Sequence, residues 1–131
     1  MCLAFAALAA ACLAVCVKRE ALSQESTVLF ALLVLSLVPY CLPKMHERYT
    51  FGADVLSLVL AVFAPGRRIL LPLCFGFASY AAYTAGLPGE KILDLKWAAM
   101  FQMVGVALTA AELWRALNTD RQNAALAEVK A

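Results

Sequence analysis

The stretch Trp97–Leu117, with the sequence WAAMFQMVGVALTAAELWRAL, decides the fold. Crossing about 30 Å of hydrocarbon takes roughly 20 helical residues, and this apolar stretch is long enough. Trp97 and Trp114 bracket it and are separated by roughly 25 Å along a helix axis, at about 1.5 Å per residue. Two indoles at that separation fit the aromatic belts at the two interfaces of a bilayer. The stretch therefore predicts a membrane-spanning helix.

Four more apolar stretches precede this one along the chain. They cover residues 2–17, 27–42, 50–64 and 69–87. The first three are short for a span, so they need snorkelling side chains or local thinning of the bilayer, and the third is alternatively re-entrant or partly interfacial. We predict an all-α, polytopic transmembrane helical bundle of about five segments over residues 1–117, followed by a polar cytoplasmic tail at residues 118–131.

The composition points the same way. Hydrophobic residues make up 64% of the chain and charged residues 15%, with a mean hydropathy of +0.81. A typical soluble domain is about half apolar and about one quarter charged, and a small one cannot hide this much apolar surface. The lipid bilayer is therefore the expected partner. The net charge of +2 is too small to indicate a nucleic-acid-binding protein.

The first stretch does not have the pattern of a cleaved signal peptide, because no basic residue precedes it and Lys18 and Arg19 follow it. Ala6, Ala10 and Ala14 lie four residues apart, as in closely packed membrane helices, although a plain alanine-rich helix explains them equally well. The five cysteines lie in or beside apolar runs without a CxxC pair, which predicts neither a disulfide framework nor a metal site. No cofactor is expected.

The basic residues predict the orientation. With five spans, seven basic residues fall on one side of the membrane: Lys18, Arg19, Arg67, Arg68, Arg115, Arg121 and Lys130. Four fall on the other: Lys44, Arg48, Lys91 and Lys96. The positive-inside rule assigns the larger set to the cytoplasm, so the loop at residues 43–49 faces outward.

That outward loop carries the candidate site. Its ionisable residues are Lys44, His46, Glu47 and Arg48, and Asp54 follows inside the next apolar stretch. Arg48 can hold a phosphate with a bidentate fork, and Lys44 adds a point charge. His46 or Glu47 is suited to positioning or deprotonating a hydroxyl. An acid inside an apolar stretch is costly unless it is paired or faces water, so Asp54 is a functional-site hypothesis by default.

A simpler interpretation stays open at this point. A turn that joins two membrane helices needs polar residues in any case, and Lys44 and Arg48 then only snorkel toward the headgroups. Asp54 then only pairs with Arg48 or His46. One histidine beside one glutamate is not a ligand set, so no metal is expected at this loop.

The string Leu42-Pro43-Lys44-Met45-His46-Glu47-Arg48-Tyr49, followed by Phe51 and Ala53-Asp54-Val55-Leu56, resembles the late-membrane motif of bacterial mannosyltransferase-like proteins. These are related to the eukaryotic enzyme that adds the second mannose to GPI anchors, and they belong to the GT-C class of polytopic glycosyltransferases. The resemblance implies an outward-facing site, a polyprenyl-phosphate sugar donor and a bacterial cytoplasmic membrane. It implies that His46, Glu47 and Arg48 lie at the donor site, that Tyr49 contributes to it, and that Arg48 and Lys44 neutralise the departing lipid phosphate.

Enzymes of this class have more than five membrane helices and carry a presumed catalytic acid in an early outward loop, which has no counterpart here. The resemblance therefore implies the carboxy-terminal part of such an enzyme, inactive alone. It would need the amino-terminal helices of the same enzyme or a separate subunit as a partner. Two alternatives remain: a small non-enzymatic membrane subunit or transporter component, in which Asp54 and His46 serve an ion path, and a structural assembly partner.

Overall fold

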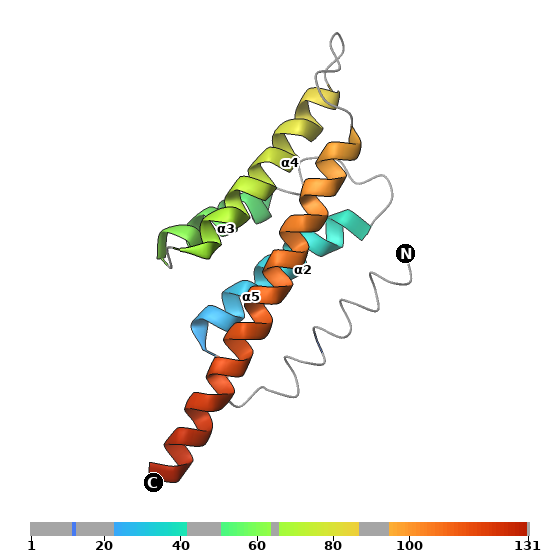
Figure 1. Cartoon of the computed structure of the whole chain (residues 1–131). Coiled ribbons are helices and arrows are strands. Elements are labelled where there is room, and N and C mark those ends of the chain that lie inside the picture. The colour runs from blue at the N-terminus through green and yellow to red at the C-terminus, as the bar shows by residue number, and fades with distance from the viewer. Residues whose placement is uncertain (1–11, 13–22, 42–50, 64–65, 87–94, 131) are drawn as a thin grey trace.

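The computed structural model of the chain describes residues 12, 23–41, 51–63, 66–86 and 95–130. Within these ranges the protein is all-helical and contains no strand, which confirms the predicted fold class at that level. The described ranges between residues 23 and 130 contain four α-helices, and Figure 1 shows them in chain order from blue to red. They are α2 (Gln24–Cys41), α3 (Phe51–Phe63), α4 (Leu70–Gly86) and α5 (Leu95–Lys130), with the 3₁₀ helix η3 (Arg67–Ile69) before α4.

Two helix boundaries follow from local sequence. Ser23 precedes α2, and its hydroxyl accepts a hydrogen bond from the Ser26 amide at 3.2 Å, as an N-cap serine does. Between α3 and η3, Gly66 has a φ of 128°, a backbone conformation that glycine adopts without a steric penalty. The Ile69 amide then donates to the Gly66 carbonyl at 3.2 Å, which closes the turn into α4.

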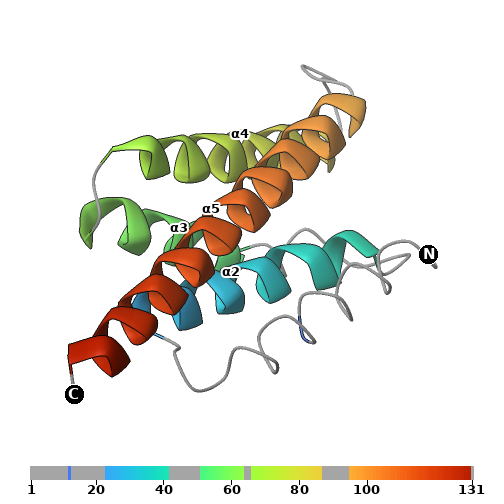
Figure 2. The same ribbon diagram turned by 60° about the horizontal axis from the view of Figure 1, so that its bottom comes forward.

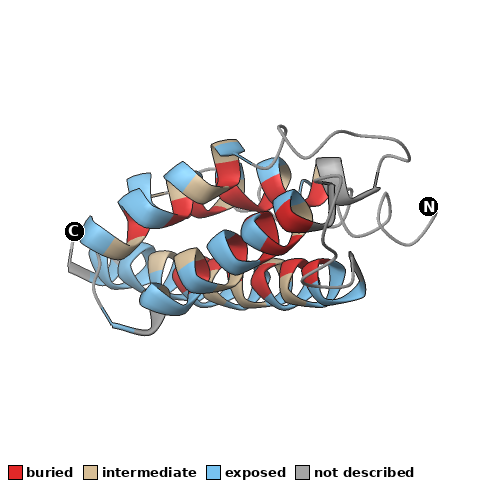
Figure 3. Ribbon diagram, turned by 90° about the horizontal axis from the view of Figure 1, so that it is seen from above, coloured by how far each residue is buried: buried red, intermediate tan, exposed pale blue. Residues whose placement is uncertain are grey.

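The four helices form a closed ring. Helix α5 packs against α4 and α2, and α3 packs against the same two helices from the opposite side, so α3 and α5 lie on a diagonal. Figures 1 and 2 show α5 crossing the other helices and extending beyond them toward the C-terminus. Figure 3 shows the buried residues gathered on the faces that the helices turn toward one another.

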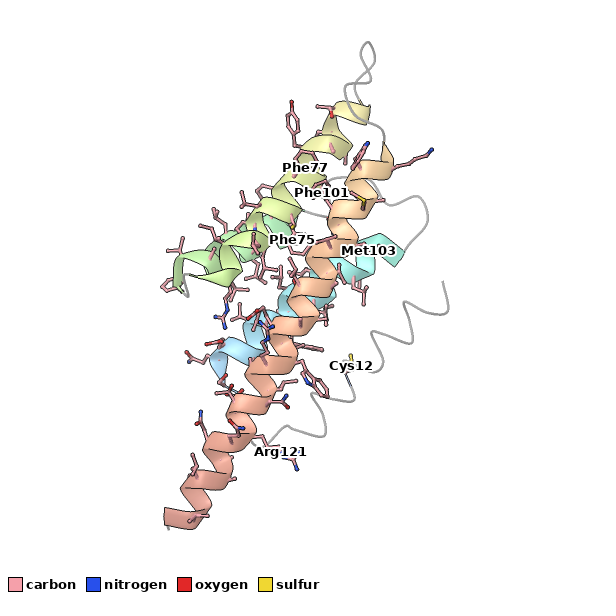
Figure 4. The ribbon with its side chains drawn as sticks, in the orientation of Figure 1. Cys12, Phe75, Phe77, Phe101, Met103 and Arg121 are labelled. Carbon is pink, nitrogen blue, oxygen red and sulfur yellow. The ribbon has the colours of Figure 1, made fainter. Side chains whose placement is uncertain are left out.

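The core is built from leucines and alanines of all four described helices around one aromatic residue of α4. Phe75 is fully buried, as are Leu29 and Leu32. A Cβ placed on Gly105 of α5 would lie 2.9 Å from Cε1 of Phe75, so only glycine allows α5 to approach this ring. Two residues after Phe75 on α4 and four residues before Gly105 on α5, the Phe77 and Phe101 rings meet with centroids 4.4 Å apart, which places both side chains in the α4–α5 contact (Figure 4).

The expectation of five spans is not shown. Of the described helices, only α5 is long and apolar enough to cross a membrane, over Lys96–Ala127. Helix α3 has 13 residues, about 20 Å at 1.5 Å per residue, which is shorter than the hydrocarbon core. The sequence predicts a polar tail at residues 118–131, and α5 continues as a helix through residues 118–130 of it. The segment at residues 2–17 lies outside the described residues except for Cys12, which is helical and exposed.

Candidate functional site

Asp54 is the one candidate site residue that the structure describes. It lies in the first turn of α3, and its Oδ2 accepts a hydrogen bond of 2.6 Å from the Ser79 hydroxyl of α4. On the same helix, the Ser57 hydroxyl donates to the Asp54 carbonyl at 2.8 Å. The carboxylate is therefore directed from α3 toward α4, between two helices that pack together.

The second carboxylate oxygen of Asp54 is not satisfied. Oδ1 is buried and has no hydrogen-bond partner among the described residues. A buried acceptor without a partner costs about 1–3 kcal/mol relative to one that is hydrogen-bonded, and a charged acceptor costs more. Such an orphan group in a folded protein calls for an explanation, and a bound donor or cation at Oδ1 supplies one. A single carboxylate with a serine hydroxyl is too small a set for a metal, and no metal-ligating cluster occurs within the described ranges.

The other five predicted site residues lie outside the described residues. These are Lys44, His46, Glu47, Arg48 and Tyr49. The structure does describe the chain on both sides of them. Helix α2 ends at Cys41, α3 begins at Phe51, and the two helices pack together, so that a Cβ placed on Gly52 would lie 3.8 Å from the Leu35 side chain.

A second polar contact crosses the bundle between α5 and α2. Nε2 of Gln102, a buried residue, donates to the Ser36 carbonyl at 3.4 Å. Ser79 and Gln102 are the polar residues that sequence analysis missed. Gln102 is the one side-chain amide in the apolar stretch 97–117, and this was a usable signal. Ser79 lies in a run of small residues, and nothing in that pattern distinguishes it from a packing serine.

Ion pairs gather at the opposite end of the bundle. The Arg68 guanidinium, which is 15% exposed, forms an ion pair with Glu25 at the start of α2 and lies 3.9 Å from Oε2 of Glu112 on α5. Arg115 binds the other oxygen of Glu112 at 2.8 Å. Three elements far apart in the sequence meet here. The ion pairs bring the start of α2, the 3₁₀ helix η3 and α5 together at this end of the bundle.

Next to this cluster, α5 holds the start of α2 through one carboxylate oxygen. Oδ2 of Asp120 accepts hydrogen bonds from the Ser23 amide at 3.2 Å, the Ser23 hydroxyl at 3.0 Å and the Ser26 hydroxyl at 2.5 Å. Burial alone would raise the pKa of Asp120, but these three hydrogen bonds to the charged form outweigh it and lower the pKa below its usual value. Asp120 therefore stays ionised and joins the two helices.

Two chemically distinct ends result. One end of the bundle has a network of ion pairs, which suits a structural role in holding α2, η3 and α5 together. The other end has an acid that is half satisfied, next to the helix boundary where the charged string ends. Comparison with known proteins returned no relative: no family model matches the chain, and neither a curated protein nor a solved structure matches it.

Proposed function

We propose that this chain is the carboxy-terminal part of an integral-membrane glycosyltransferase that uses a polyprenyl-phosphate sugar donor at an outward-facing site. The observation that carries the proposal is the state of Asp54. Its carboxylate is held by Ser79 through one oxygen, while the other is buried without a partner among the described residues. This acid follows the Lys44–Tyr49 string by five residues, so a ligand held by the string lies within reach of α3.

The distribution of side chains supports a membrane environment. Bulky apolar residues are exposed on the outer faces of α3 and α4, including Phe63 at 84% and Val62 at 71%. Soluble monomers rarely leave an apolar surface of this extent open to water. A lipid environment accounts for these faces because it is itself apolar.

The buried polar residues support the same environment. Seven are buried among the described residues: Ser26, Ser36, Ser57, Ser79, Thr84, Gln102 and Thr109. Several donate to a carbonyl one turn earlier, as Ser36 does to Leu33 at 3.1 Å and Thr109 does to Gly105 at 2.8 Å. Serine and threonine satisfied within their own helix are compatible with a helix in lipid, where no water is at hand.

Aromatic residues indicate the depth of Asp54. Tyr80 and Tyr83 near the end of α4 and Trp97 near the start of α5 are all about half exposed. Tyrosine and tryptophan are enriched where the hydrocarbon meets the headgroups. Ser79 directly precedes Tyr80, and its hydrogen bond to Asp54 supports a position of this acid next to the aromatic level. A carboxylate at that depth can reach a headgroup-level sugar phosphate without being buried at the bilayer centre.

In the proposed reaction an acceptor hydroxyl attacks the anomeric carbon of the donor, and the bond from that carbon to the lipid phosphate oxygen breaks. Arg48 and Lys44 neutralise the phosphate that leaves, which is the charge that develops in the transition state. His46 or Glu47 orients the acceptor hydroxyl, and Oδ1 of Asp54 accepts a hydrogen bond from a sugar hydroxyl. The carboxylate that takes the proton from the acceptor hydroxyl, as general base, comes from amino-terminal helices of the enzyme or a separate subunit, so the chain alone does not catalyse transfer.

Binding of the lipid phosphate tests this without requiring turnover. The full chain in phosphatidylcholine nanodiscs is titrated with undecaprenyl phosphate, and binding is followed by ³¹P NMR. We expect saturable binding that Arg48→Ala weakens at least tenfold. Arg121→Ala is the matched control, because Arg121 is exposed on the projecting end of α5 (Figure 4) and its loss removes the same charge.

Two results contradict the proposal. Equal binding by the Arg48→Ala and Arg121→Ala variants means that the lipid phosphate responds only to net charge. Proton flux through proteoliposomes that requires Asp54, without lipid-phosphate binding, supports the transporter alternative instead.

A further inference from the structure

A level of charged side chains crosses one end of the bundle. The Arg68 guanidinium of η3 forms ion pairs with Glu25 of α2 and Glu112 of α5, so these three elements meet at the same height. Arg115, which also pairs with Glu112, has a side chain that is 56% exposed. We call these four residues the ion-pair level. Because charged groups are costly in hydrocarbon, this level marks where the apolar part of the bundle ends.

A level of aromatic side chains lies at the other end. Helices α4 and α5 run in opposite directions (Figure 1), and their Phe77 and Phe101 rings are in contact. From that contact, Tyr80 lies three residues further along α4 and Trp97 four residues back along α5, about 5 Å and 6 Å in the same direction. Both side chains are about half exposed, as is that of Tyr83. We call Tyr80, Tyr83 and Trp97 the aromatic level.

The faces that α3 and α4 expose between these levels are apolar. Their large exposed side chains there include Val55, Leu58 and Leu73. Asp54 is the one acidic or basic residue within α3 and α4, and its carboxylate is hydrogen-bonded to Ser79 between the two helices. We call these exposed faces the apolar belt. A hydrocarbon layer between two headgroup layers fits the belt, because it offers no partner to polar groups and takes tyrosine and tryptophan at its edges.

The two levels are close together on both helices that connect them. Glu112 and Trp97 are 15 residues apart on α5, which is about 22 Å at about 1.5 Å per residue. Leu70, which directly follows η3, and Tyr83 are 13 residues apart on α4, which is about 20 Å. Helix α5 crosses the other helices at an angle (Figure 2), and an inclined helix spans less thickness than its length. The belt is therefore about 8 Å thinner than the hydrocarbon core of an average bilayer, which is about 30 Å.

We propose that the lipid partner of the bundle is a thin bilayer, with a hydrocarbon layer of about 22 Å that ends at the ion-pair level and at the aromatic level. Lipids with short acyl chains match the belt directly, and lipids with longer chains must compress around it. This inference rests on the proposed membrane environment. It is independent of sugar transfer, because neither level is defined by a residue of the Lys44–Tyr49 string.

Quenching of tryptophan fluorescence by brominated lipid measures the lipid preference. Trp97 and Trp114 are the two tryptophans of the chain, and they are 50% and 59% exposed. The full chain is reconstituted into mixtures of dibromostearoyl phosphatidylcholine with dimyristoleoyl, dioleoyl or dierucoyl phosphatidylcholine, whose acyl chains lengthen in that order. We expect the dimyristoleoyl lipid to displace the brominated lipid at least about threefold more effectively than the dierucoyl lipid does, because it matches the belt without compression.

A matched pair of cysteine variants tests where the belt ends. In a full chain whose five native cysteines are replaced by alanine, Leu58→Cys lies in the middle of α3 and Leu126→Cys lies on α5 beyond the ion-pair level. The two leucines are equally exposed, at 58% and 59%. In nanodiscs, we expect a membrane-impermeant maleimide to label Leu58→Cys at least about tenfold more slowly than Leu126→Cys, because hydrocarbon excludes the reagent. Circular dichroism establishes that both variants keep their helices.

The possible failures are distinguishable. Equal displacement by all three lipids, or strongest displacement by the dioleoyl or dierucoyl lipid, overturns the thin belt while the membrane environment and lipid-phosphate binding through Arg48 stand. Labelling of Leu58→Cys as fast as Leu126→Cys, or tryptophan fluorescence that brominated lipid does not quench, overturns the membrane environment itself, and the proposed function fails with it.

Discussion

The contact between Gly105 and Phe75 yields a prediction whose magnitude comes from the geometry. A Cβ on Gly105 would lie 2.9 Å from Cε1, 3.0 Å from Cζ and 3.2 Å from Cδ1 of Phe75. Phe75 is fully buried in the core, so its ring has no open space into which to move. Gly105→Ala therefore forces α4 and α5 apart or strains the ring, and such overpacking costs about 1–3 kcal/mol.

Gly76→Ala is the matched control, because Gly76 lies in the middle of α4, is exposed, and a Cβ there meets nothing within 4 Å. Replacing a mid-helix glycine by alanine gains about 1 kcal/mol of helix propensity in both cases. We therefore expect Gly76→Ala to stabilise the protein by up to about 1 kcal/mol. Gly105→Ala should range from neutral to about 2 kcal/mol destabilising, once the overpacking cost is subtracted.

The assay is unfolding by SDS in mixed micelles, followed by circular dichroism at 222 nm. In a double-mutant cycle, Phe75→Leu should relieve part of the cost of Gly105→Ala, with a coupling free energy of about 0.5 kcal/mol or more. The reasoning is refuted if Gly105→Ala is as stabilising as Gly76→Ala, or if the cycle shows no coupling, because either result means that the helices are not in contact at this point.

Three further predictions concern the polar contacts. Ser79→Ala should destabilise the protein by about 1–3 kcal/mol because Asp54 loses its hydroxyl donor, whereas Ser79→Ala combined with Asp54→Leu should cost less; SDS unfolding of both variants decides this. Arg68→Ala should lower the free energy of unfolding by about 1–3 kcal/mol, because Glu112 then keeps only Arg115, its partner on the same helix. An SDS titration that shows no loss of stability would mean that the ion pairs around Arg68 are fully solvated. Hydrogen bonds lower the pKa of Asp120, so its contribution to the stability of the fold is present above the unfolded pKa of about 4 and is lost as pH falls through the folded pKa. Asp120→Asn should therefore reduce the difference between the unfolding midpoints measured at pH 7 and pH 3.

Helix positions were predictable from the sequence because long apolar runs interrupted by charge and proline leave few alternatives. The stretches at residues 50–64 and 69–87 contain the helices at 51–63 and 70–86, and the stretch at 27–42 overlaps the helix at 24–41, which begins three residues earlier. The extent of α5 was not predicted, since polarity after Leu117 marks the end of an apolar run rather than the end of a helix. Alanine-rich polar sequence continues a helix without difficulty.

The candidate site was predictable only in part. That Asp54 is exceptional follows from the sequence, because an acid in an apolar stretch is rare whatever surrounds it. Its partner does not follow, since the bond to Ser79 joins residues 25 positions apart on different helices. The same holds for Gln102 and Ser36, which are 66 residues apart. Lys44, His46, Glu47, Arg48 and Tyr49 remain predictions that rest on the resemblance.

The helical class and the approximate positions of α2, α3 and α4 follow from the sequence alone. They depend on local hydropathy, which can be read along the chain without its tertiary contacts. Only the tertiary structure decided which helices touch, that Arg68 lies between Glu25 and Glu112, and that one oxygen of Asp54 has no described partner. These depend on the rotation of each helix about its axis, which is set by close packing at points such as Gly105 against Phe75.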